Sequence, residues 1–140
     1  MTSAVTKDIL PDFKRRIKKL TSREVLVGVP AEDASRDQIE GEEPISNAAL
    51  MYIHENGSPA NNLPARPVIK PAIEKKRKES QKRFIKAADA AISGNDPEMD
   101  RQFNAVGQIT ASQAHNLIRN GLEPPLSPVT VAVRKSRGEA

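Results

Sequence analysis

Two histidines, His54 and His115, are the side chains of this sequence whose ordinary pKa lies nearest neutrality. His54 precedes Glu55, and an imidazole beside a carboxylate could exchange protons with a substrate, as in a hydrolase. A lone acid–base pair is an unspecific signal, so we expect these two side chains to have a structural or surface role. His115 stands beside Asn116 in a predicted helix and is expected on its polar face.

Other patterns that carry chemistry are missing from the sequence. The absence of cysteine excludes disulfides, thiolate nucleophiles and cysteine-based zinc sites. There is no HExxH pair, no glycine-rich phosphate loop and no GxSxG motif, and both Ser58 and Ser127 precede a proline that marks a turn. The sequence therefore predicts a protein that is not an enzyme, with no catalytic residue, no cofactor and no metal.

Charge is distributed unevenly along this basic chain, whose net charge is +4. Residues 32–43 carry a net charge of −5, residues 14–19 hold five basic side chains and no acid, and residues 70–86 carry +6. Blocks of opposite sign could steer identical subunits into head-to-tail association. They could equally be solvated surfaces, which is the ordinary role of charge runs.

A basic chain could also bind nucleic acid through its phosphates, and a DNA-binding or packaging accessory protein is the alternative function. The chain has three Phe, one Tyr and no Trp, so it lacks a platform on which bases could stack. A helix-turn-helix would need short helices joined by a tight turn, whereas two long helices are predicted here.

Apolar periodicity and the positions of proline and glycine predict four helices, over residues 7–20, 45–55, 72–93 and 96–120. The first is expected to become regular near Leu10 because Pro11 fits only a first turn. The last is expected to begin with Asp96 as its N-cap and Pro97 at its first position. Its apolar face is predicted to comprise Met99, Phe103, Val106, Thr110, Ala114 and Leu117.

Two short strands are predicted from β-favouring residues, EVLVGVP at 24–30 and VTVAV at 129–133. Residues 31–43 are predicted to form an acidic loop, and residues 134–140 a basic tail that frays. Residues 58–71 contain four prolines and are predicted to form an extended arm, stiffened because each proline fixes its own φ.

These elements predict a single domain over residues 1–140 with an α+β fold. A small, few-stranded sheet would pack with two long helices and one or two shorter helices, and the proline-stiffened arm would lie beside them. An apolar content of 37% is low, so we expect partner subunits to cover surface that the chain cannot bury alone. No apolar run reaches the length of a membrane span and the N-terminus lacks a signal peptide, so the protein is expected to be made in the cytosol, with no membrane contact.

Several segments then form a recognisable series. Residues 45–57 read ISNAALMYIHENG, residues 63–67 read LPARP and residues 70–73 read KPAI. In order and spacing they resemble the "A-x-x-HE-x-G … IPARPF-x-x-PA" stretch of the virion-morphogenesis proteins of tailed bacteriophages. IRNGLEPPLSPVT at 118–130 is similar to that family's "I-x-x-G-x-x-PPLSPxT" segment, and VLVGVP at 25–30 to its "V-x-VGIP" element. The sequence departs from the pattern at Val68, where an aromatic residue is common.

The resemblance implies a structural virion protein, a neck or tail-completion or tail-terminator subunit that joins or closes the tail at its head end. It implies a homo-oligomeric ring, a hexamer, with other neck, connector and tail-tube proteins as partners and genomic DNA near the ring lumen. The expected location is the virion, after assembly in the host cytoplasm.

Ten residues are candidates for interaction with partners. Arg66, held between Ala65 and Pro67, could present its guanidinium to a carboxylate of its own fold, with Glu55 as candidate, or to one on a neighbouring subunit. The candidates comprise residues of the proline-rich region and of the basic blocks: Glu55, Gly57, Pro64, Arg66, Pro67, Lys14, Arg15, Lys75, Lys76 and Arg77.

Overall fold

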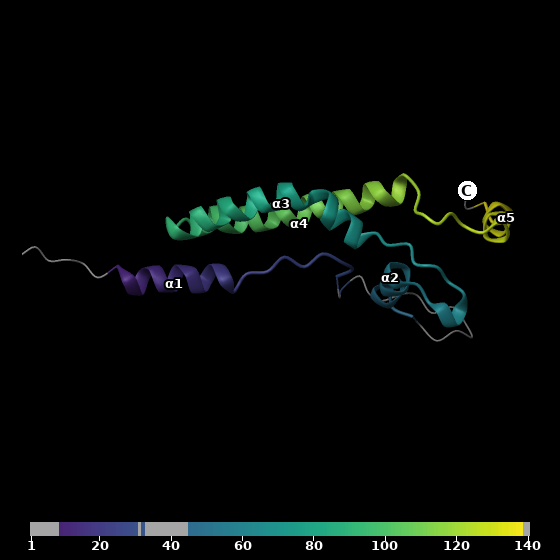
Figure 1. The fold of residues 1–140 in the computed structure, drawn as a ribbon, viewed down its shortest axis with the longest axis horizontal. Helices are drawn as coiled ribbons and strands as arrows, with labels where there is room; N and C mark the ends of the chain where they lie inside the picture. Colours follow the sequence, from purple (N-terminus) through teal and green to yellow (C-terminus); the bar gives the residue numbers. More distant parts are fainter. Residues whose placement is uncertain (1–8, 31, 33–44, 139–140) are drawn as a thin grey trace, which may run out of the picture. The chain divides into compact units, whose positions relative to one another are not determined.

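The computed structural model describes residues 9–30, 32 and 45–138, which contain five α-helices and one short 3-10 helix (Figure 1). In chain order these are α1 (Leu10–Thr21), α2 (Asn47–Asn56), η2 (Pro59–Asn61), α3 (Ile69–Ile92), α4 (Asp96–Arg119) and α5 (Pro128–Ser136). Among the described residues, no helix is both long and apolar enough to cross a bilayer.

The chain divides into two compact units, and the long helices α3 and α4 contribute to both. Unit 1 comprises Met1–Val27 and Ile73–Ser112, and unit 2 comprises Gly28–Ala72 and Gln113–Ala140. That the whole chain is one domain stays a prediction. Apart from Glu32, the predicted acidic loop lies outside the described residues.

The predicted α+β fold is wrong, because the described part of the chain contains helices and no strand. At 24–30 the alternation expected of a strand is present: Val25, Val27 and Val29 are half-buried, while Leu26 is 83% exposed. A strand also needs a neighbour that accepts and donates its backbone hydrogen bonds, and none of the described segments lies alongside as a strand. The predicted strand at 24–30 is therefore wrong: the alternation is present, but the described residues form neither this strand nor the sheet that it implied.

The predicted strand at 129–133 is helix α5. Ser127 is its N-cap, where the side-chain oxygen accepts a hydrogen bond from the Thr130 N–H at 3.1 Å. Pro128 follows at the first helical position, where its missing N–H costs nothing. These start signals outweigh the β propensity of Val129 and its alternating partners. The first residues of the predicted basic tail, through Ser136, form the last turn of the same helix.

The proline-rich arm at 58–71 is not extended throughout, which corrects another part of the predicted fold. Ser58 and Leu63 pair as an isolated antiparallel bridge around η2, and Asn62 adopts a left-handed conformation with φ of 52°. Helix α3 then starts at Ile69 rather than after Pro71, which occupies its first turn. Prolines therefore shape a tight loop and a helix start here.

The core of unit 1 lies between the end of α3 and the start of α4. Ala87, Ala90 and Ala91 surround the fully buried Met99, with Leu20 and Phe103 at the edge. The six predicted apolar positions of α4 are all buried or half-buried, which confirms its periodicity. Asn95 rather than Asp96 caps this helix, because the Asn95 Oδ1 accepts from the Glu98 N–H at 3.2 Å.

Helix α1 is attached to the same unit mainly by polar contacts. The Arg16 guanidinium donates to the Ile92 carbonyl at 2.5 Å, Lys19 pairs with Asp96, and Arg23 pairs with Asp100 at 3.2 Å. These ion pairs are partly exposed, and such pairs stabilise a fold by only about 0–1 kcal/mol each.

Candidate functional site

The residues quoted for the resemblance converge in unit 2, beginning with the turn at Gly57. Gly57 ends α2 with φ of 76° and ψ of 179°, a conformation essentially restricted to glycine. A Cβ atom there would lie 2.8 Å from both the Ala65 nitrogen and the Leu63 oxygen. Glycine is therefore required twice, by backbone conformation and by the close approach of the returning chain.

Glu55, the penultimate residue of α2, caps the N-terminus of α3. Its Oε2 accepts from the N–H groups of Val68 and Ile69 at 2.8 and 3.0 Å, and its Oε1 accepts from that of Lys70 at 2.8 Å. Those amides belong to the helix start, where no intrahelical acceptor is available to them. A carboxylate is favoured there because the helix dipole presents its positive end.

Two opposed effects determine the pKa of Glu55. Burial works to raise it, because the charged form loses solvation, whereas the three backbone N–H donors and the charge of Lys70 work to lower it. The lowering effects prevail, so the pKa lies below its ordinary value and the cap is ionised at neutral pH.

Arg66 connects the loop after Gly57 to the C-terminal segment. Its backbone N–H donates to the His54 carbonyl at 2.7 Å. Its side chain donates from Nε to the Pro124 carbonyl at 2.7 Å and from Nη2 to the Pro125 carbonyl at 3.0 Å. The planar fork of the guanidinium suits two neighbouring acceptors of this kind.

The intramolecular partner of Arg66 is thus a pair of peptide carbonyls, not the carboxylate of Glu55. Glu55 is occupied by the amides of α3, and the two side chains act at different places in one network. We refer to Glu55, Gly57 and Arg66, with their backbone partners at 68–70 and 124–125, as the Glu55–Arg66 network. The sequence named its three side chains but missed both sets of backbone partners. The PPLSP segment was the available signal for one of them.

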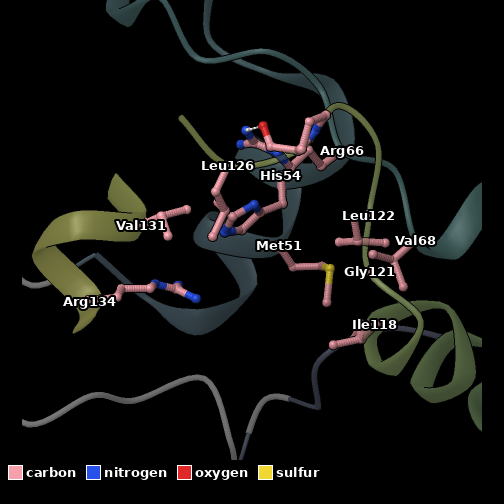
Figure 2. Close-up of a pocket in the computed structure, with 11 residues that line it drawn as sticks. Met51, His54, Arg66, Val68, Ile118, Gly121, Leu122, Leu126, Val131 and Arg134 are labelled. Carbon is pink, nitrogen blue, oxygen red and sulfur yellow. Dashed lines mark hydrogen bonds between the residues drawn. The ribbon is translucent and has the colours of Figure 1, made fainter. Parts of the chain in front are cut away.

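A pocket of about 650 Å³ opens beside this network, within unit 2. Figure 2 shows Met51 from α2, Ile118 from α4 and Val131 from α5 around it, with His54 and Arg66 together on one side. The walls are mainly apolar, and Arg134 adds a second guanidinium that forms no ion pair in the described chain. The remaining wall residues are Val68, Gly121, Leu122, Pro125 and Leu126.

The other candidate residues lie elsewhere. Pro64 is exposed and Pro67 half-buried on the segment leading into α3. The five basic candidates belong to unit 1, on α1 and α3: Lys14, Arg15, Lys75 and Arg77 are exposed, and Lys76 is half-buried. Their predicted role in binding partners stays a prediction.

The described residues include no cluster of three or more His, Cys, Asp or Glu side chains that could hold a metal ion.

Comparisons with known protein families, curated proteins and solved structures find no match to this chain.

Proposed function

We propose that this chain is a structural subunit of a tailed-phage virion, located at the neck or at the head-proximal end of the tail. Copies of the chain associate into a ring, a hexamer by family resemblance, that joins or closes the tail. Other neck, connector and tail-tube proteins contact the ring.

The observation that carries this proposal is the amount of apolar surface left uncovered. Helices α1, α2 and α5 contain no buried residue. Large apolar side chains stand exposed on them, among them Leu10 at 53%, Tyr52 at 70% and Val129 at 73%. Most helical stability in proteins comes from packing of an apolar face rather than from propensity. Contacts with further chains would supply that packing.

The Glu55–Arg66 network gives the resemblance a physical basis. Glu55 and Gly57 belong to the HENG part of the first segment, Arg66 to LPARP, and Pro124 with Pro125 to PPLSP. These segments are held together by the hydrogen bonds and the close approach described above. A family whose members share these three segments would therefore share one local arrangement of α2, the loop after Gly57 and the segment before α5.

Locating the chain in purified virions tests the proposal. A particle carrying a short epitope tag after Ala140 is labelled with antibody and imaged by electron microscopy. Label confined to the head–tail junction is the expected result. Label on the capsid or tail fibres, or a particle that lacks the chain, would overturn it.

A further inference from the structure

Helix α3 carries four lysines on one face of its solvent-exposed half. Lys75, Lys78, Lys82 and Lys86 follow one another at intervals of three, four and four residues, which places them along one side of an α-helix. All four side chains are exposed. We call this set the lysine stripe.

The acids nearest to the lysine stripe do not neutralise it. Glu79 pairs with Lys76 at 3.0 Å, and Glu74 pairs with Arg77 at 3.6 Å. Both carboxylates are therefore engaged by other cations, while no stripe lysine joins an ion pair within the described chain. Asp89, one turn beyond Lys86, falls on the same face and limits the stripe at its C-terminal end.

The surrounding unit has the same excess of positive charge. Residues 9–27 and 73–112 contain 14 basic and eight acidic side chains, a net charge of +6. Six of the eight acids already form ion pairs: Asp12, Glu74, Glu79, Asp96, Glu98 and Asp100. The positive potential is consequently concentrated on cations such as the lysine stripe, which have no carboxylate partner.

We propose that the lysine stripe binds the phosphate backbone of duplex DNA without reading its sequence. Eleven residues separate its ends, which is roughly 16 Å at the rise of an α-helix. Duplex DNA presents one negative charge per about 1.7 Å of its axis, so an entire stripe can face phosphates at any register.

The residue type suits a ligand that offers acceptors at many positions, such as the phosphates of a duplex. A lysine ammonium is a compact point charge on a flexible stem, and it needs no fixed acceptor geometry. Arginine forks predominate where carboxylates or phosphates are held at defined positions, and the stripe contains none, so its contacts require no fixed register. The described chain also offers no cluster of exposed aromatic side chains for stacking bases, which points to backbone contacts on a duplex.

Fluorescence anisotropy of the full chain with a labelled mixed-sequence duplex tests this inference across a salt series. If all four lysines contact phosphates, the logarithm of the binding constant should fall against that of salt concentration with a slope of about −3.6. The variant K75Q/K78Q/K82Q/K86Q should lose most of this slope and bind at least tenfold more weakly at low salt. Thermal unfolding of the variant should be unchanged, because glutamine has a helix propensity close to that of lysine.

The matched control removes four charges from unit 2, as R119Q/R134Q/K135Q/R137Q, and should keep the slope. An equal loss of salt dependence in both variants would mean that only the net charge matters, and would overturn the assignment of DNA binding to the lysine stripe. Competition by poly-L-glutamate as effective as that by unlabelled duplex would identify an acidic protein surface as the ligand instead. Neither outcome bears on the location of the chain in the virion, so this inference and the proposed function fail separately.

Discussion

Glu55 shows how one carboxylate can hold a helix start. Its pKa lies below the ordinary value, so the ionised side chain stabilises the folded state above the pKa of the unfolded chain, which is about 4.3. That contribution is lost as the pH falls through the lower, folded-state pKa, because protonation removes the charge that the three amides favour.

Replacing Glu55 with glutamine should therefore lower the free energy of unfolding by about 1.5–3 kcal/mol at pH 7, the range expected for hydrogen bonds to a charged group. The difference in free energy of unfolding from the wild type should shrink below pH 4. Urea unfolding at pH 7 and again below pH 4 measures this difference. Glu24→Gln, at an exposed position, is the control and should leave the free energy of unfolding unchanged at both pH values. An equal loss in both variants would contradict the capping role of Glu55.

Gly57 and Gly121 form a second matched pair. Both have positive φ, but a Cβ at Gly57 meets backbone atoms at 2.8 Å, whereas one at Gly121 meets nothing within 4 Å. Gly121→Ala should cost about 1–2 kcal/mol, the ordinary left-handed penalty. Gly57→Ala should cost more, about 3 kcal/mol or above, from backbone strain and collision together. Thermal unfolding compares them, and equal costs would argue against the close approach.

Arg66 links two structural elements, because it holds the loop after α2 against the segment before α5. Lysine at this position could reach one carbonyl but not both, since it lacks the planar fork. Arg66→Lys should lower the free energy of unfolding by about 1 kcal/mol. It should also speed hydrogen exchange in α5.

The control for Arg66→Lys is Arg119→Lys, an exposed position at the end of α4. Hydrogen exchange by mass spectrometry resolves α5 from α2 and α4. Unchanged protection of residues 128–136 in Arg66→Lys would show that the two carbonyl contacts do not hold this segment.

The sequence predicts helices here better than it predicts strands, for a physical reason. Helix α4 is specified by local signals, namely its cap, Pro97 and its periodic apolar face, and it forms almost where expected. At 129–133 the local signals conflicted, and Ser127 with Pro128 prevailed over β-branched residues. A sheet depends on distant partners, so a favourable strand pattern such as 24–30 cannot by itself establish one.

The candidate site was predictable to a similar extent. Side chains that act by type and spacing, Glu55, Gly57 and Arg66, could be named from the resemblance. Their partners are backbone amides and carbonyls, which every residue possesses, so the letters at 68–70 do not mark them as partners. The segment at 124–125 is marked only by its place in PPLSP.

The whole molecule is proposed to associate with further copies, and the exposed apolar face of α5 is a candidate contact surface. Val129 and Val133 lie one turn apart, 73% and 43% exposed. V129S/V133S should leave unfolding of the monomer unchanged and raise the dissociation constant of the assembly tenfold or more, because burying one valine contributes about 1.5 kcal/mol. Thr130→Ser on the same helix is the control. Sedimentation at several concentrations measures both, and identical dissociation constants would exclude α5 from the contact.

Native mass spectrometry of the purified full chain addresses self-association most directly. The predicted result is a closed oligomer of one defined size, six copies by family resemblance, that persists on dilution through the micromolar range. A chain that remains monomeric throughout that range, alone and with tail-tube or connector proteins added, would contradict the proposal that it works by forming a ring.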